Sequence, residues 1–163
     1  KINYCILRYF NIAGSSSSGK IGLINKSDHL FKNFSREIIK KRPILKIYGG
    51  NYDTKDGSCI RDFIHVSDIA EIHYKVLEKI NNLNNSKILN CGYNKGISVF
   101  EVAKVFKNQS SKKVEILVSK RRKGDLVKII ASNKKLKKFI KWKPKFNNLN
   151  TIVKSCINWE KRQ

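Results

Sequence analysis

The chain has 163 residues, enough for one domain with its own core, and 40% of them are apolar. No apolar run approaches the roughly 20 residues that a membrane-spanning helix needs, so a transmembrane class is excluded. The formal net charge of +23 comes from 28 Lys and only 7 Arg, and the lysines are spread along the whole chain. Because dedicated nucleic-acid sites concentrate Arg and aromatic side chains, we expect any polyanion binding to be weak, non-specific and salt-sensitive, and no specific nucleic-acid partner.

The four cysteines, Cys5, Cys59, Cys91 and Cys156, are far apart and form no Cys-x-x-Cys pair. Neither a zinc site nor a redox motif is indicated, and the histidines have no partners at metal-binding spacing. We therefore expect no metal and a reducing, cytoplasmic environment. The chain opens without Met or a secretory signal and begins in strand-like sequence, so a portion of a longer protein is expected.

Short apolar stretches alternate with amphipathic ones along the chain. Strands are predicted over residues 3–11, 44–48, 87–91 and 114–118, and helices over 29–41, 67–80, 98–106, 134–140 and 149–159. Asp28, Ser98 and either Ser67 or Asp68 are the expected helix caps. The inner faces of the first two helices are predicted to be Leu30, Phe34, Ile38 and Ile39, then Ile69, Ile72, Val76 and Leu77. This alternation predicts an α/β fold.

One glycine pattern imitates a nucleotide-binding motif. Gly14, Gly19 and Lys20 have the spacing of a phosphate-binding P-loop. Ile21, however, takes the place of the hydroxyl residue that binds magnesium, and the sequence that follows does not favour a helix. We therefore interpret residues 13–22 as a Gly/Ser loop without phosphate-binding function. The Gly-x-Gly-x-x-Gly dinucleotide fingerprint occurs nowhere in the chain.

Several polar residues stand in apolar surroundings and suggest a site when taken together. They are Arg8, Asn11, Arg61, Asp62, Arg121, Arg122 and Asp125. Arginine binds diphosphate through two parallel hydrogen bonds, and aspartate suits the paired hydroxyls of a ribose. Asp62, His65 and Asp68 also have the chemistry of an acid–base group, but hydrogen bonding and helix capping are the favoured interpretation.

Longer motifs are more specific. In chain order they are Leu-Arg-Tyr-Phe-Asn-x-Ala-Gly from Leu7, Ile-Gly at Ile21, Ile-Tyr-Gly-Gly-Asn-Tyr-Asp-Thr from Ile47, Arg-Asp-Phe-Ile-His-Val-x-Asp from Arg61, Leu-Asn-x-Gly from Leu89, Arg-x-Gly-Asp from Arg122 and Trp-x-Pro from Trp142. Together they cover nearly the whole chain. They resemble the C-terminal half of UDP-glucose 4-epimerases, which have the extended short-chain dehydrogenase/reductase (SDR) fold, a Rossmann-like α/β fold.

The resemblance implies a division of the chain. Residues 1–12 and 62–92 would contribute the last strands of the parallel Rossmann sheet. Residues 13–61 and 93–163 would form the small UDP-sugar-binding α/β subdomain. Two positions depart from the family, because Ile12 and Lys32 stand where prolines are common.

The same resemblance implies roles for individual residues. Tyr9 and Phe10 would lie against the nicotinamide end of NAD. The residues implied in binding UDP-glucose or UDP-galactose are Asn11, His29, Leu30, Lys46, Tyr48, Arg61, Arg122 and Asp125. Among these, the two arginines would hold the diphosphate and the aspartate would accept the ribose hydroxyls.

The family activity is the interconversion of UDP-galactose and UDP-glucose in galactose metabolism, by hydride transfer between C4 of the hexose and NAD. The Tyr-x-x-x-Lys pair and glycine-rich NAD loop that this chemistry needs precede the matched region in the family, and the 163 residues contain neither. The resemblance thus implies an isomerase whose catalytic residues are absent here, so this chain alone is predicted to be inactive. Its implied partners are the N-terminal half and a second copy in a homodimer. A related NAD-dependent sugar-nucleotide dehydratase or decarboxylase, and a non-catalytic basic module binding UDP-sugar or polyanions, remain alternatives.

Overall fold

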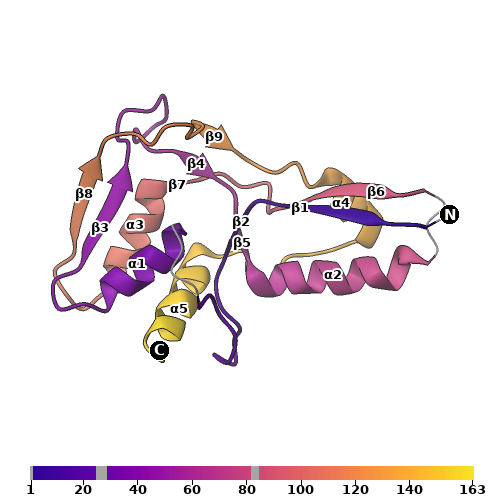
Figure 1. Cartoon of the computed structure of the whole chain (residues 1–163), viewed down its shortest axis with the longest axis horizontal. Coiled ribbons are helices and arrows are strands. Elements are labelled where there is room, and N and C mark those ends of the chain that lie inside the picture. Colours follow the sequence, from indigo (N-terminus) through magenta and orange to yellow (C-terminus); the bar gives the residue numbers. More distant parts are fainter. Residues whose placement is uncertain (1, 25–28, 82–84) are drawn as a thin grey trace.

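Two groups of helices and strands flank a central pair of parallel strands (Figure 1). The computed structural model describes residues 2–24, 29–81 and 85–163. In the first group, β1 (Cys5–Tyr9) pairs in parallel with β6 (Lys87–Cys91). The helix α4 (Lys134–Ile140) contacts both β6 and α2 (Val66–Ile80).

The second group surrounds another parallel pair, formed by β3 (Ile44–Tyr48) and β8 (Glu115–Ser119). The helices α1 (Leu30–Ile38) and α3 (Val99–Asn108) pack against β3. This arrangement leaves Lys46 and Tyr48 exposed on β3, whereas Leu45 and Ile47 are buried, as the two-residue repeat of a strand requires.

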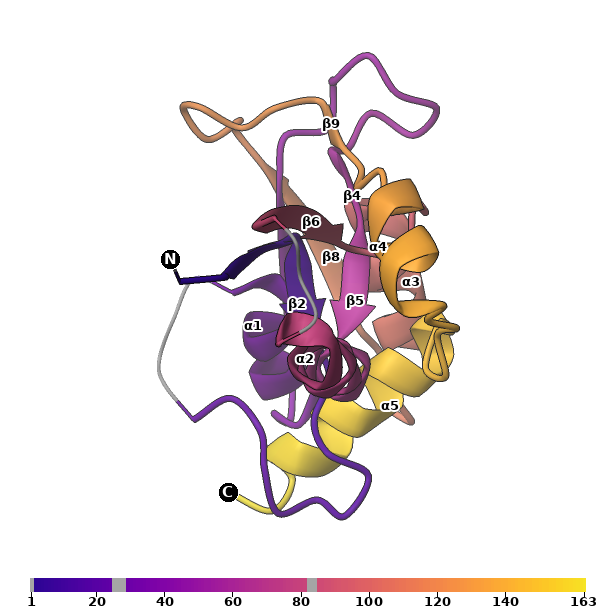
Figure 2. The same cartoon turned by 90° about the vertical axis from the view of Figure 1, so that its right-hand side faces the viewer.

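The central pair consists of β2 (Asn11–Ala13) and β5 (Phe63–His65), again parallel. Figure 2 shows these two strands side by side, with α5 (Leu149–Glu160) nearby. Helix α5 packs against α1 and α3 and so joins the centre to the second group.

A small three-stranded sheet connects the remaining segments. Its middle strand, β4 (Ile60–Arg61), pairs antiparallel with β7 (Ile97–Ser98) and parallel with β9 (Lys128–Ile129). Because β4 is followed after one residue by β5, this sheet fixes the position of Arg61 beside the central strands.

The hydrophobic core is continuous across the two groups. Its aromatic centre is a set of edge-to-face contacts in which the ring of Phe31 lies 5.0 Å from Phe63 and 5.7 Å from Phe106, and Phe34 lies 5.5 Å from Phe106. Such contacts add about 0.5–1.5 kcal/mol each to the burial of apolar area. They lock α1 against β5 and α3.

Most predicted elements are confirmed, with one instructive exception. The predicted strand over residues 3–11 is two strands, because the chain changes partner at Phe10. The Phe10 N–H donates to the Cys91 carbonyl at 3.3 Å, whereas the Asn11 N–H donates to the Asp62 carbonyl at 3.1 Å. The backbone thereby leaves β6 and joins β5. Tertiary pairing, not local sequence, sets this boundary.

Two residues predicted to face the core were assigned wrongly. Leu77 is 66% exposed and Ile39 is 37% exposed. On α1 the predicted core residues Phe34 and Ile38 are confirmed, and Phe31 joins them in one buried stripe at helical spacing. The helix predicted over 29–41 ends at Ile38.

The helix caps were predicted in part. Ser98 is confirmed, since its side chain accepts from the Glu101 N–H and Glu101 accepts from the Ser98 N–H, forming a capping box. The α2 cap is His65, whose Nδ1 accepts from the Ser67 N–H at 3.1 Å, and not Ser67 or Asp68. The predicted Asp28 cap lies outside the described residues, and the N-cap position of α1 is His29.

The three polar residues with acid–base chemistry serve the fold, as interpreted from the sequence. Asp62 is fully buried and accepts three backbone N–H groups, from Tyr93 at 2.9 Å, Asn94 at 2.8 Å and Ala131 at 3.2 Å. Asp68 is also fully buried and accepts from the Tyr93 hydroxyl. Tyr93 therefore links both carboxylates, and its own phenol accepts from the backbone N–H of His65.

No described helix is both long and apolar enough to cross a membrane. The Gly/Ser segment that resembled a P-loop contains no described helix up to residue 24, and it turns through positive φ at Gly14 and Gly19.

The cysteines give a direct test of the packing. All four are free thiols, and Cys5 is partly exposed while the others are buried. Burial raises the pKa of Cys91 to about 12 and that of Cys156 to about 11, so at about pH 8 both are protonated and unreactive. We expect iodoacetamide to alkylate Cys5 first in the native chain, as measured by peptide mass spectrometry. In guanidinium chloride all four should react, and native alkylation of Cys91 as fast as Cys5 would contradict the packing.

Candidate functional site

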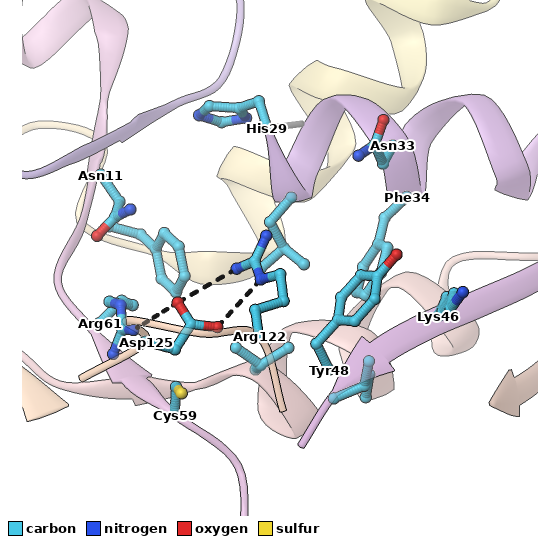
Figure 3. A pocket seen from close by; sticks show the side chains of 14 residues that line it. Asn11, His29, Asn33, Phe34, Lys46, Tyr48, Cys59, Arg61, Arg122 and Asp125 are labelled. Carbon is cyan, nitrogen blue, oxygen red and sulfur yellow. Dashed lines mark hydrogen bonds and ion pairs between the residues drawn. The ribbon is translucent and has the colours of Figure 1, made fainter. Parts of the chain in front are cut away.

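A cavity of about 350 Å³ opens between α1, β3 and the segment that follows β8 (Figure 3). The described lining residues are Asn11, His29, Leu30, Asn33, Phe34, Lys46, Ile47, Tyr48, Cys59, Arg61, Phe63, Val99, Arg122 and Asp125. All eight residues predicted to bind a UDP-sugar are in this set. They come from β2, the start of α1, β3, β4 and the segment after β8, which are far apart in the sequence.

A carboxylate between two arginines forms one wall of the cavity (Figure 3). Asp125 accepts from the Arg122 Nε at 3.0 Å and lies 3.5 Å from an Arg61 guanidinium nitrogen. One anion thus faces two cations, so the wall carries a net positive charge. Such a wall favours a second anion with several acceptor oxygens.

The two arginines are held differently. The Arg61 guanidinium donates to the carbonyls of Ile60 at 2.9 Å and Leu126 at 2.7 Å, and its side chain is only 12% exposed. The Arg122 side chain is 52% exposed. Arg61 is therefore a fixed, pre-positioned donor, whereas Arg122 can reorient at smaller energetic cost.

The neighbouring wall is aromatic and basic. The Tyr48 ring lies 5.1 Å from the Arg122 guanidinium and 5.1 Å from the Lys46 Nζ. Figure 3 places Tyr48 between these two cations. An exposed ring flanked by cations offers a stacking surface for a planar, electron-rich heterocycle.

His29 forms the opposite side, at the start of α1. Its Nε2 lies 2.6 Å from the Ile12 carbonyl, so we assign the proton to Nε2, which donates to that oxygen. Burial lowers the pKa of His29, and the hydrogen bond to Ile12 offsets this only in part. The imidazole is therefore neutral near pH 7, and its Nδ1 is a buried acceptor with no hydrogen-bond partner in the described part of the chain.

The remaining lining residues were not predicted, although local spacing would have found several. Asn33 and Phe34 follow His29 and Leu30 by one helical turn. Cys59 and Phe63 flank Arg61 at two-residue spacing and so share its face of the chain. Their contribution is apolar or neutral, and they set the shape of the cavity.

The two residues predicted to contact NAD lie elsewhere. Tyr9 ends β1 and is 48% exposed, and its hydroxyl lies 2.6 Å from His73 Nε2 on α2. Phe10 is partly buried, and neither residue lines the cavity around Asp125. Among the described residues, no group of three or more His, Cys, Asp and Glu side chains could hold a metal ion.

Comparison with known proteins gives a consistent result. Residues 1–92 match the model of the NAD dependent epimerase/dehydratase family. The UDP-glucose 4-epimerase of Azospirillum brasilense is 39% identical over 157 residues, covering 96% of this chain and 45% of that protein. That of Halalkalibacterium halodurans is 37% identical, covering 98% and 48%. The chain therefore spans about half the length of these curated relatives.

Solved structures agree with the sequence comparison. The UDP-glucose 4-epimerase from Bifidobacterium longum in complex with NAD+ and UDP has a TM-score of 0.88 and 29% identity, covering 98% of this chain and 48% of that one. The UDP-Glc/GlcNAc 4-epimerase of Campylobacter jejuni has a TM-score of 0.78 and 39% identity, covering 99% and 49%. The α/β fold thus matches part of an extended SDR epimerase structure.

Proposed function

The chain belongs to the NAD-dependent epimerase/dehydratase family, and from this premise we propose that it is the UDP-sugar-binding, C-terminal part of a UDP-glucose 4-epimerase. The observation that carries the proposal is the gathering of eight residues from five separate segments around one cavity. Similarity to a structure solved with NAD+ and UDP supports the choice of ligand.

The charged wall suggests how a sugar nucleotide enters. A diphosphate would take the place of Asp125 as the anion facing Arg61 and Arg122. Asp125, whose carboxylate both arginines now contact, would then be free to accept the two ribose hydroxyls. This exchange keeps both cations paired before and after binding, and the ribose hydroxyls would hydrogen-bond the Asp125 carboxylate. The uracil would stack near Tyr48, Asn11 would hydrogen-bond the diphosphate, and His29 would lie beside the UDP moiety.

Binding through the nucleotide explains how this region would serve the reaction. Contacts to UDP lie away from C4 of the hexose, and their binding energy holds the sugar in position for hydride transfer. NAD, when bound, supplies the hydride acceptor. Tyr9 is the last residue of β1 and Phe10 follows it, at the carboxyl edge where open parallel sheets bind cofactors, so we propose that both contact the nicotinamide of NAD. The phosphates of NAD would be bound by residues other than Tyr9 and Phe10.

Arg122→Ala should weaken binding of UDP about tenfold or more. A charge-assisted hydrogen bond contributes about 1.5–3 kcal/mol. The variant removes the guanidinium that would make this bond to the diphosphate and that lies beside the Tyr48 ring. Isothermal titration calorimetry with UDP measures the change.

Lys123→Ala is the matched control, because this neighbouring exposed cation does not line the cavity. Its affinity for UDP should remain that of the unmodified chain. Arg61→Ala is a less specific test, since Arg61 also donates to two backbone carbonyls. Equal affinities in Arg122→Ala and Lys123→Ala would remove Arg122 from the site and contradict the proposed binding mode.

A further inference from the structure

A second pocket of about 370 Å³ lies beside the first, and His29 lines both. It is lined mainly by the segment after β2, by α1 and by the last turns of α5. Most of its surface is apolar, and the principal apolar residues are Ile12, Ala13, Ile21, Leu23, Phe31 and Trp159. None of these six lines the cavity around Asp125.

Two buried polar atoms of residues that line this pocket have no hydrogen-bond partner among the described residues. Ser35 lines the pocket and is 1% exposed, and its Oγ has no hydrogen-bond partner in the part of the chain that the structure describes. The Nδ1 atom of His29, a partly exposed residue, is also buried and has no partner among the described residues. Native proteins seldom leave such atoms unpaired. Because the His29 Nε2 proton is committed to the Ile12 carbonyl, Nδ1 requires a donor, while the Ser35 hydroxyl can donate or accept.

The charged residues at the pocket favour an uncharged occupant. Lys32 Nζ lies 2.7 Å from Glu160 Oε2, and these side chains are only 6% and 8% exposed. The two charges neutralise each other within the pocket wall. A charged ligand would have to be desolvated without gaining a free counter-ion, which is unfavourable in apolar surroundings.

We infer that this pocket is a second binding site, for a small uncharged molecule that has an apolar body and a hydroxyl group. The apolar body would pack against Phe31 and Trp159. The hydroxyl would donate to His29 Nδ1 or pair with Ser35 Oγ, since a hydroxyl group can both donate and accept. This site is distinct from the proposed sugar-nucleotide cavity, although His29 is shared between them.

The chain contains a natural reporter for this site. Its two tryptophans are Trp142 and Trp159, and only Trp159 lines the pocket. The Trp159 indole N–H donates at 3.1 Å to the carbonyl of Leu23, which also lines the pocket. In ¹⁵N-labelled chain, titration with phenol should shift the Trp159 indole resonance saturably and leave that of Trp142 unchanged. Trp159→Phe assigns the resonance.

Toluene is the matched probe, because it has the size of phenol without the hydroxyl. We expect phenol to bind about threefold to tenfold more tightly than toluene in the unmodified chain, and this ratio to approach one in Ser35→Ala if Ser35 is the hydroxyl's main partner. His29→Phe tests the other partner in the same way. Ser86→Ala, an exposed serine outside this pocket, should leave the ratio unchanged.

Three outcomes would overturn the inference. They are the absence of a Trp159 shift up to the solubility limit of phenol, equal affinities for phenol and toluene, and competition between UDP and phenol, which would place phenol in the first cavity. Ser35→Ala removes a hydroxyl that has no hydrogen-bond partner among the described residues, so the variant should still fold, and circular dichroism checks this. The affinities of the unmodified chain for phenol and toluene test whether the pocket binds a hydroxyl group, and this test needs no variant.

Discussion

Incubated with NAD and UDP-galactose, the purified 163-residue chain should form no UDP-glucose. Hydride transfer requires tightly held NAD and a base whose pKa suits removal of the C4 hydroxyl proton. The sequence contains no Gly-x-Gly-x-x-Gly loop, and none of its 6 Tyr is followed by Lys four positions later. Tyr9, the tyrosine predicted to lie beside the nicotinamide, has Ala13 at that place.

Tyr9 and His73 resemble a phenol–base couple, but this pair lies in the wrong place. Tyr9 and His73 are 2.6 Å apart, but neither lines the cavity that contains the proposed UDP-sugar residues. His73 Nδ1 also lies 2.8 Å from the Ile69 carbonyl, so we assign Nδ1 as a donor and Nε2 as the acceptor of the Tyr9 hydroxyl. This pair is therefore expected to hold β1 against α2.

A coupled assay measures the absence of turnover directly. UDP-glucose dehydrogenase oxidises any UDP-glucose formed, and the NADH it releases is followed by fluorescence. Adding an intact UDP-glucose 4-epimerase to the same mixture shows that the assay responds. Turnover above that of a mixture without the chain would show that residues within these 163 positions suffice for catalysis, and Tyr9→Phe would then be the first variant to examine.

The longer elements of this fold were predictable because their patterns are local. The segments 44–48, 87–91 and 134–140 coincide with β3, β6 and α4 as predicted. The short strands β4, β5, β7 and β9 were not predicted, since two or three residues carry no measurable periodicity. They are strands only because distant segments pair with them, as Ile60 pairs with both Ser98 and Lys128.

The first cavity and the second pocket differ in how far sequence could reveal them. The residues of the first were assigned through motifs that resemble a known family, and the structure brings all eight around one cavity. No pattern marked the second pocket. Ser35 lies on the inner face of α1. Its burial depends on the packing of α5 against α1, which the local sequence does not reveal. Lys32 was noted only as a departure from proline, and its buried partner Glu160 is far along the chain.

Asp62 connects the central strands to the segments after β6 and β9 more directly than any pattern suggested. Its carboxylate lies between β4 and β5 and binds the backbone after β6 and the residues following β9. Gly92 is required beside it, because a Cβ there would lie 2.5 Å from the Ala131 Cβ and 2.7 Å from Asp62 Oδ2. The turn at Gly92 thus depends on close approach to Asp62.

Asp62→Ala should lower the free energy of unfolding by about 3 kcal/mol or more, the largest stability effect that we expect of a single substitution here. Three backbone N–H groups would lose their acceptor, and each buried unpaired donor costs about 1–3 kcal/mol unless water reaches it. Asp62→Asn should be less severe, because the amide oxygen can still accept from the two donors that share Oδ2, those of Asn94 and Ala131. Asp53→Ala, in an exposed turn, is the matched loss of one carboxylate and should change stability by less than about 0.5 kcal/mol.

Urea denaturation followed by circular dichroism gives the free energies of unfolding of the three variants under one set of conditions. The order of destabilisation should be Asp62→Ala, then Asp62→Asn, then Asp53→Ala. If Asp62→Ala and Asp53→Ala unfolded at the same urea concentration, the Asp62 carboxylate would not be holding β5, the turn at Gly92 and Ala131 together. The position of Arg61, the residue immediately before it, would then need another explanation, because β4 alone contributes only two residues to its sheet.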